Sequence, residues 1–404
     1  MNTSKKLLLI PIVGLLLTVS ASLVYTKYNN ATRSDAPIVY SEKAMLNELW
    51  ADYKVNNIEP NSNRTIDKSQ NNITTSEGQS YTMLRAVWQD DRTTFDESWE
   101  FTKNNMQRPQ DNLFSWKYGQ KLDGSYGILT DIGGQNTASD ADADIALSLM
   151  MAYSRWNDAK YLYQAKQIIT SIWNEEVVMV AGKPVMTADD LEKNAETEVV
   201  VNPSYFAPSS YKLFAKVDPS HDWTGLADHS YDLLNQLSED TLGSTTSSKL
   251  PPNWIKMNIE TGAFVPATQA GLDTNYGFDA LRIPFRMALD YAWNKDERAK
   301  IVLQHFGFLD SEWQSDNKLQ AIYAHDGTVV GNYETPAMYG GSIGYFKLVQ
   351  PEAAKEIYQQ KLQTLYNPDT QKARTNLSYY DSNWAWFGIA LMTDNLPNLA
   401  LENY

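Results

Sequence analysis

The stretch ASDADADIALSLMMAYSRW, residues 138–156, joins a cluster of acids to an amphipathic pattern. Asp140, Asp142 and Asp144 stand at alternate positions, and apolar residues then recur at positions 145, 149, 152 and 156. This spacing places the apolar side chains on one face of a helix, so we predict a helix over Asp142–Trp156. The acids precede most of that helix, where negative charge favours the helix dipole.

The three aspartates need further stabilisation, because clustered anions repel one another. A cation, a hydrogen-bond network or a bound proton can supply it. A calcium loop is one alternative, and an EF-hand loop counted from Asp140 would need Gly at its sixth position and Glu at its twelfth. Those positions hold Ile145 and Met151, so the sequence argues against a calcium loop.

Amphipathic patterns recur along the rest of the chain and predict mostly helices. The further predicted helices are Ser41–Tyr53, Glu77–Gln89, Asp158–Trp173, Pro208–Lys216, Thr224–Leu237, Phe278–Trp293, Asp296–Phe308, Met338–Val349, Glu352–Leu365 and Asp381–Met392. The strand candidates are Glu175–Ala181 and Val199–Val201. No long Pro- or Ser-rich break interrupts residues 40–404, so we predict one large all-α domain built as an α/α toroid of about six helix pairs.

Composition excludes several classes of site. The chain of 404 residues has no cysteine and a net charge of −15. Without cysteine there can be no disulfide, thiolate metal site or cysteine nucleophile. Negative charge repels phosphate, so we expect no nucleic-acid partner. The four histidines show no ligand spacing, so we predict no histidine-based metal site.

The first 30 residues have the pattern of a targeting segment. Lys5 and Lys6 precede an apolar run at residues 7–25, which is typical of a secretory signal, with Val19-Ser20-Ala21 as a candidate cleavage site. The run is also nearly long enough to span a bilayer, which needs roughly 20 residues, so an uncleaved membrane anchor is an equal alternative. We expect the protein to be extracellular or at the cell surface, with residues 31–39 as a polar linker.

A second acidic segment is SEGQSY, residues 76–81. Ser76 can cap a helix, which places Glu77 in its first turn. The ordinary interpretation is that Glu77 only favours the helix dipole. Gly78 favours a functional site instead, because Gly costs roughly 1 kcal/mol inside a helix and would let a ligand approach the backbone.

A third acidic segment is NYGFDALRIPFR, residues 275–286. Asp279 and Arg282 are three residues apart and would share one face of a helix, which is also the spacing of an ordinary surface ion pair. Pro284 indicates that a helix starts nearby. Asp279 then lies at a loop–helix junction, where catalytic groups often lie.

Together the three acidic segments resemble glycoside hydrolase family 8. Residues 138–156 are similar to the signature of that family, SEGQSY to the segment with its proton donor, and FDALRIPFR (278–286) to the segment with its base. NPSYFAP (202–208) and YYDSNWAWFGIAL (379–391) resemble further family segments. The resemblance covers about residues 40–395 and implies an (α/α)6 barrel that hydrolyses β-1,4-linked glycans with inversion.

The resemblance also implies roles for individual residues. Glu77 would be the general acid, Asp279 the general base, and Asp140 would bind and distort the sugar at the cleavage subsite. Asp142 would support Asp140, and Arg282 would orient the base or bind sugar hydroxyls.

Three aromatic residues are further candidates for sugar contact. Trp116 and Tyr205 could serve as stacking platforms, although either ring could equally pack in the core, and Tyr276 lies close to Asp279 in the sequence.

Inversion needs a protonated acid and an ionised base roughly 6.5–9.5 Å apart. Burial and the negative charge of Asp140 would raise the pKa of Glu77, whereas Arg282 would help to keep Asp279 ionised. Neither role needs a metal ion or an organic cofactor.

We therefore predict a monomeric, secreted or membrane-anchored endo-β-1,4-glucanase acting on a cellulose-like polysaccharide. Within the family the alternatives are a chitosanase, a xylanase or exo-oligoxylanase, and a mixed-linkage glucanase. The alternative from another class is a non-catalytic glycan-binding protein associated with exopolysaccharide synthesis, which would most plausibly have lost one of the acids. A polysaccharide lyase would use a Tyr or His base with cationic groups, which fits the acidic segments poorly.

Overall fold

The computed structural model describes residues 41–269, 271–373 and 377–400. The chain divides into a larger compact unit, Glu42–Asn367 with Gln371–Tyr404, and a smaller unit, Met1–Ser41 with Pro368–Thr370. Of the smaller unit the structure describes Ser41 and the turn Pro368–Thr370. The predicted targeting segment and linker lie outside the described residues. No helix in the part of the chain that the structure describes is long and apolar enough to cross a membrane.

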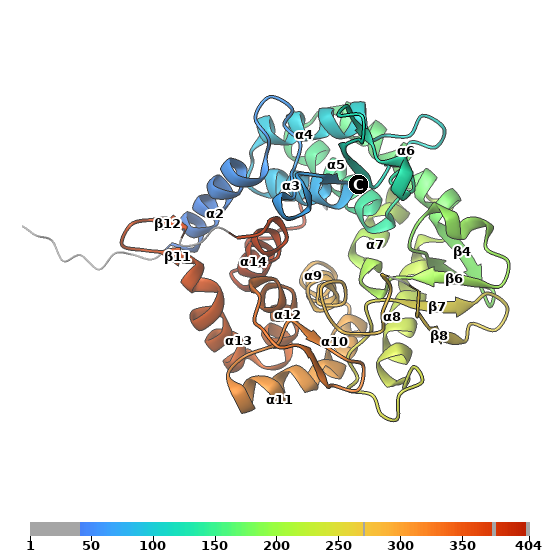
Figure 1. The fold of residues 1–404 in the computed structure, drawn as a ribbon, viewed down its shortest axis with the longest axis vertical. Helices are drawn as coiled ribbons and strands as arrows, with labels where there is room; N and C mark the ends of the chain where they lie inside the picture. The colour runs from blue at the N-terminus through green and yellow to red at the C-terminus, as the bar shows by residue number, and fades with distance from the viewer. Residues whose placement is uncertain (1–40, 270, 374–376, 401–404) are drawn as a thin grey trace, which may run out of the picture. The chain divides into compact units, whose positions relative to one another are not determined.

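An inner ring of helices forms the centre of the larger unit (Figure 1). Its members are α3 (Ser76–Trp88), α5 (Ser139–Trp156), α7 (Pro208–Val217), α9 (Arg282–Asn294), α12 (Pro336–Val349) and α14 (Tyr379–Met392). Each member packs against the next one in this order. The ring closes where Tyr81 of α3 packs edge-on against Trp384 and Phe387 of α14, with ring centroids 5.7 and 5.5 Å apart.

A second set of helices packs outside the inner ring. It consists of α2 (Glu42–Asn57), α4 (Arg92–Asn105), α6 (Ala159–Glu176), α8 (Trp223–Glu239), α10 (Glu297–Leu303), α11 (Gly307–Asp316) and α13 (Pro351–Ile357). Helices α4, α6, α8, α10 and α13 each pack on the inner helix that precedes them, whereas α2 packs on the last inner helix, α14. The first and last helices thereby complete a closed set of inner–outer pairs, which is the predicted α/α toroid.

Arg85 fixes the seam between the two ends of this barrel. Its guanidinium is fully buried and lies 5.0, 4.3 and 5.1 Å from the ring centroids of Trp50, Tyr53 and Trp386. It also donates a hydrogen bond to Asn383 Oδ1 at 2.9 Å. A buried cation needs such partners, so α3 holds both α2 and α14 in place.

Glycines allow three inner helices to approach closely. A Cβ atom on Gly340 of α12 would lie 2.0 Å from the carbonyl oxygen of Trp384 in α14. A Cβ atom on Gly344, one helical turn further along α12, would lie 2.2 Å from the carbonyl oxygen of Pro284 in α9. Any larger residue at either position would push α12 away from its neighbours.

Short antiparallel strands connect the helices. The structure has more of them than the two strand segments that the sequence predicted. They form the sheets β1–β2–β3 (Thr74–Thr75, Lys117–Gln120, Tyr126–Ile128) and β6–β7–β8 (Glu198–Val201, Ile255–Asn258, Phe264–Pro266), and the pairs β4–β5 (Val177–Val180, Lys183–Met186), β9–β10 (Ile322–Tyr323, Val329–Gly331) and β11–β12 (Tyr366–Asn367, Lys372–Ala373). The all-α prediction therefore holds for the barrel but not for its connections.

The helix predictions also differ from the structure in places. Helices α4 and α11 were not predicted, and α9 begins at Arg282 rather than Phe278. The predicted helix Glu352–Leu365 is α-helical only to Ile357 and continues as a π-helical and a 3₁₀ turn.

Candidate active site

Three carboxylates from distant parts of the chain meet on Arg282. Its Nη1 donates to Glu77 Oε2 at 2.8 Å and to Asp140 Oδ2 at 3.1 Å, and its Nη2 donates to Asp279 Oδ1 at 2.5 Å. The guanidinium is almost completely buried. The structure therefore brings together the three predicted catalytic acids and the predicted arginine.

The fold explains this convergence, because each group lies at the N-terminal end of an inner helix. Glu77 and Asp140 are the second residues of α3 and α5, and Arg282 is the first residue of α9. Asp279 lies in the turn immediately before α9, as the sequence predicted. Inner helices that run side by side place their N-terminal ends together, where their dipoles favour negative charge.

Glu77 is held in the first turn of α3 with part of its side chain, 23%, exposed. Tyr379 donates a hydrogen bond to Oε1. Burial raises the pKa of Glu77, the charge of Asp279 raises it further, and Arg282 and Tyr379 oppose the rise. The expected direction is correct, and the negative charge of Asp279 contributes to it as well as burial. The helix cap is Thr75, whose hydroxyl accepts from the Gly78 N–H at 3.0 Å, and not Ser76.

Asp279 is held by three donors, two of which the sequence analysis did not identify. Besides Arg282, Asn202 Nδ2 donates to Oδ1 and Trp254 Nε1 donates to Oδ2, both at 3.0 Å. Strand β6 ends just before Asn202 and β7 begins just after Trp254, and Val201 pairs with Ile255. Sheet pairing therefore places both donors at the carboxylate. Asn202 opens the segment NPSYFAP, which was the available signal for it.

Asp140 is almost completely buried, unlike the other two acids. Burial raises the pKa of Asp140 to about 7, with the negative charge of Glu77 adding to the rise and Arg282 opposing it. Its Oδ1 accepts a hydrogen bond from the Ala141 N–H at 2.8 Å. At neutral pH this group can therefore act as donor or acceptor toward a neighbouring hydroxyl.

The other two aspartates of the signature face elsewhere. Asp144 pairs with Arg286 through two hydrogen bonds of 3.0 Å. Asp142, which was predicted to support Asp140, is fully buried and accepts from the Phe114 N–H at 3.0 Å. Helix geometry explains the direction of Asp142, because residues two apart, such as Asp140 and Asp142, project to different faces.

A cleft of about 550 Å³ adjoins Asp279 through Trp254, which lines it. Trp116, Tyr205 and Trp254 line it, together with Thr137, Asp189 and Glu192 among others. The Trp116 indole is partly exposed and donates to the Gly133 carbonyl at 2.9 Å, which fixes the ring. The Tyr205 ring packs edge-on against Trp254, with centroids 5.8 Å apart, and its centroid lies 5.2 Å from the Arg282 guanidinium. Both predicted platforms therefore line the cleft, but Tyr205 is almost completely buried.

The prediction that Tyr276 contacts sugar is wrong. Its ring is fully buried, its hydroxyl bonds to Ser342 Oγ at 3.2 Å, and its backbone pairs with Tyr323. The exposed ring near the base is Phe278, which packs against Tyr380 at 5.9 Å between centroids. Tyr380 also donates a hydrogen bond to the Phe278 carbonyl.

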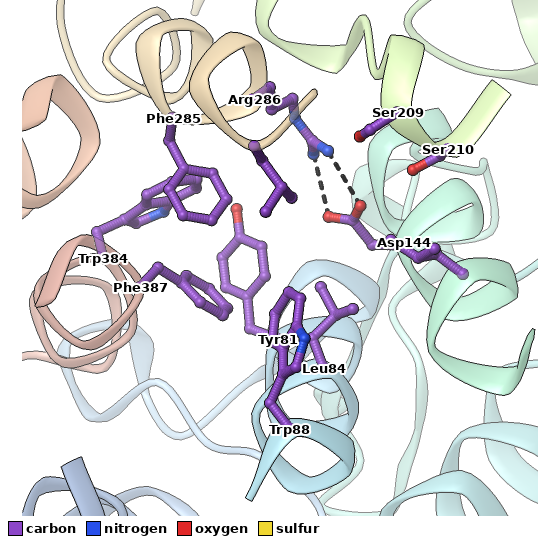
Figure 2. A pocket seen from close by; sticks show the side chains of 12 residues that line it. Tyr81, Leu84, Trp88, Asp144, Ser209, Ser210, Phe285, Arg286, Trp384 and Phe387 are labelled. Atoms are coloured by element: carbon purple, nitrogen blue, oxygen red, sulfur yellow. Dashed lines mark hydrogen bonds and ion pairs between the residues drawn. The ribbon is translucent and has the colours of Figure 1, made fainter. Parts of the chain in front are cut away.

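A second, much smaller cavity lies among the inner helices (Figure 2). Tyr81, Phe285, Trp384 and Phe387 surround it, and the Asp144–Arg286 ion pair lies at one side. With a volume of about 20 Å³ it has room for one water molecule and none for a sugar ring. No cluster of three or more His, Cys, Asp and Glu residues suited to a metal ion occurs among the described residues.

Comparison with known proteins agrees with this geometry. The model of the glycosyl hydrolases family 8 matches residues 28–363. Endoglucanase A of Acetivibrio thermocellus is 28% identical over 401 residues, which cover 94% of this chain and 76% of that protein.

Solved structures share the fold. A family 8 endoglucanase from Klebsiella pneumoniae is similar at a TM-score of 0.69 and 23% identity, covering 86% of this chain and 99% of that one. A β-1,3-1,4-glucanase from a Paenibacillus species is similar at a TM-score of 0.72 and 21% identity, covering 88% and 94%. The barrel is therefore the (α/α)6 barrel of these proteins, and the chain belongs to glycosyl hydrolase family 8.

Proposed function

We propose that this protein is an inverting endo-β-1,4-glucanase that cleaves a cellulose-like polysaccharide. The observation that carries the proposal is the meeting of Glu77, Asp140 and Asp279 on Arg282, beside a cleft with aromatic walls. The endoglucanase names of related proteins support the β-1,4-glucan substrate.

Glu77 acts as the general acid and Asp279 as the general base. Glu77 gives its proton to the glycosidic oxygen while the bond between that oxygen and the anomeric carbon breaks. Asp279 takes a proton from a water molecule whose oxygen bonds to the anomeric carbon from the opposite face. Each step thus has one proton donor and one acceptor, and the configuration inverts.

The geometry supports this division of roles. Because both carboxylates bond to the nitrogens of one guanidinium, their separation is limited to about the width of that group plus two hydrogen bonds. This upper limit overlaps the lower part of the roughly 6.5–9.5 Å that an inverting pair needs for a sugar and a water. The three donors on Asp279 occupy three of its four acceptor positions and leave one for the water.

Asp140 and the cleft walls bind the polymer in this proposal. Asp140 contacts a sugar hydroxyl at the point of cleavage, next to the Arg282 nitrogen that it shares with Glu77. Trp116 and Trp254 contact apolar sugar faces, since aromatic rings bury such surfaces well.

We further propose that the protein is exported and acts as a monomer at or outside the cell surface. The basic start and the apolar run at residues 7–25 support export, either by a cleaved signal or by a retained anchor. Fractionation of cells that express the full chain, with N-terminal sequencing of the product, distinguishes the two. Recovery of the full-length chain in the soluble intracellular fraction would contradict export.

A reducing-sugar screen over carboxymethylcellulose, lichenan, xylan and chitosan tests the substrate. We expect release from carboxymethylcellulose with an early fall in viscosity, as endo cleavage requires. Release from xylan or chitosan alone would replace the proposed substrate, and an early fall with lichenan alone would indicate a mixed-linkage glucanase. If all four polymers are inert, the proposal gives way to a glycan-binding protein.

A further inference from the structure

Asp142 and Glu176 form a buried carboxyl pair behind the wall of the cleft. Both side chains are fully buried and interact with each other: burial raises the pKa of both, and the charge of Asp142 raises the pKa of Glu176 further. One oxygen of each has an outside donor: the Phe114 N–H at 3.0 Å for Asp142 Oδ1, and the Thr137 hydroxyl at 2.5 Å for Glu176 Oε1. The remaining oxygens, Asp142 Oδ2 and Glu176 Oε2, are buried and have no hydrogen-bond partner in the described part of the chain.

Among the described residues, the one cation that faces the pair is already shared by two other carboxylates. The charged groups that face the pair are Arg108, Asp111 and Asp190. Arg108 already donates to Asp111 at 2.5 Å and to Asp190 at 2.6 Å. Two ionised carboxylates without a cation are strongly unfavourable in a buried site, so one of them has to bind a proton.

We propose that Glu176 keeps its proton and donates it from Oε2 to Oδ2 of ionised Asp142, and that this pair positions the sugar-binding wall of the cleft. Asp142 is the ionised partner because it accepts a backbone N–H and lies in the first turn of α5, where the helix dipole favours an anion. One shared proton satisfies both oxygens that otherwise have no donor. Burial raises the pKa of both groups, which agrees with one bound proton in the pair. The interaction between them raises the pKa of Glu176 further and lowers that of Asp142, which favours Glu176 as the site of the proton.

The pair joins three segments that build the cleft. Phe114 lies two residues before Trp116, and Thr137 lines the cleft itself. Glu176 is the last residue of α6, and its backbone carbonyl accepts from the Thr187 hydroxyl at 2.8 Å. The positioning role rests on the proposed function of the cleft, whereas the shared proton does not.

Replacing Glu176 by Gln tests the proton while keeping both hydrogen bonds. The amide N–H can donate to Asp142, and the amide oxygen can accept from Thr137. A carboxyl that is protonated in the folded state and ionised in the unfolded state makes folding less favourable as the pH rises. The wild type should lose this stability as the pH rises, and E176Q should not. We therefore expect the difference in Tm, E176Q minus wild type, to increase by about 2–5 °C between pH 4 and pH 8.

The neighbouring, partly exposed Glu175 provides the matched control. E175Q removes one charge from the same turn of α6, and its Tm relative to the wild type should stay constant over this range. An E176Q difference that is equally independent of pH would show that Glu176 is ionised in the folded protein and would overturn the proposal. The measurement needs no substrate, so it stays valid if the proposed function fails.

Kinetics of a second variant test the positioning role. E176A removes the hydrogen bonds, and we expect a several-fold higher KM for the polymer with a smaller change in kcat, which E176Q should restore. An unchanged KM in folded E176A would refute positioning. If E176A does not fold, the KM of E176Q still tests the proposal. At pH 5 position 176 is neutral in both the wild type and E176Q, so the two proteins should have the same KM. A higher KM in E176Q would contradict the proposal that Gln replaces a protonated Glu176.

Discussion

Trp254 donates its indole N–H to the Asp279 carboxylate at 3.0 Å, so a ring that lines the cleft also orients the proposed base. Asn202 donates to the other oxygen of the same carboxylate. The base is therefore fixed from two sides by neutral donors, in addition to Arg282. A base held in this way has little freedom to turn away from its water molecule.

Replacing Trp254 by Phe should lower kcat with little change in KM. Phe keeps a ring in the cleft wall but lacks the N–H that orients Asp279. Loss of a hydrogen bond to a charged group corresponds to about 1.5–3 kcal/mol, so we expect a fall in kcat of about 10- to 100-fold. Steady-state kinetics on carboxymethylcellulose provide the measurement.

Trp156 offers a matched control, because its indole N–H also donates to an aspartate, Asp90, at 2.9 Å. W156F removes the same type of bond outside the cleft and should leave kcat unchanged. Equal losses in W254F and W156F would mean that the effect is general destabilisation.

Replacing Glu77 by Gln should abolish hydrolysis without abolishing binding. Gln cannot give a proton to the leaving oxygen, and loss of general acid catalysis costs roughly 10²- to 10⁴-fold in rate. Cello-oligosaccharide binding, measured by calorimetry, should persist. E100Q, at an exposed position of α4, is the control. Near-normal turnover of every polymer by purified E77Q would remove Glu77 from the mechanism.

Replacing Tyr379 by Phe should move the alkaline limit of activity upward. The general acid works only while protonated, so activity is lost as the pH rises through the pKa of Glu77. The Tyr379 hydrogen bond lowers that pKa, against the larger effect of burial, and its loss should therefore raise the pKa further. The measurement is the pH profile of kcat/KM.

The control for this variant is Y163F, since Tyr163 is exposed on α6. A downward shift in Y379F, or an equal shift in both variants, would contradict the assignment of the alkaline limit to Glu77.

Replacing Gly340 by Ala should destabilise the barrel, because the added Cβ would overlap a backbone oxygen of α14. We expect the free energy of unfolding to fall by about 2–4 kcal/mol in denaturant titrations. Gly307 is the control, since a Cβ there has no heavy atom within 4 Å. G307A should be neutral or stabilising, and equal effects of the two variants would contradict the close packing of α12.

The positions of the three candidate acids could be predicted from the sequence because the acids lie in segments with strong local patterns. Glu77 and Asp140 begin amphipathic helices, and Pro284 marks the junction that follows Asp279. Asn202 and Trp254 could not be placed in the same way, because strand pairing between β6 and β7 brings them to the base. Such a pairing of distant segments leaves no local periodicity to read.

The wrong predictions have similar physical causes. Helix α4 was missed because its buried face includes Ser98 and Thr102, whose hydroxyls and a backbone oxygen receive hydrogen bonds from the buried Gln79 amide. These polar residues interrupt the apolar pattern that Phe95, Trp99 and Phe101 would otherwise make. Asp142 was predicted to support Asp140 although its i, i+2 spacing already placed it on another face of the helix.

The anomeric form of the first product tests the central claim most directly, since Glu77 and Asp279 can act as an acid and base on opposite sides of the sugar only if the configuration inverts. Proton NMR during the first minutes of hydrolysis of a β-1,4-linked cello-oligosaccharide distinguishes the two forms before they equilibrate. We predict that the α-anomer appears first and the β-anomer grows only by mutarotation. Initial appearance of the β-anomer would contradict the account.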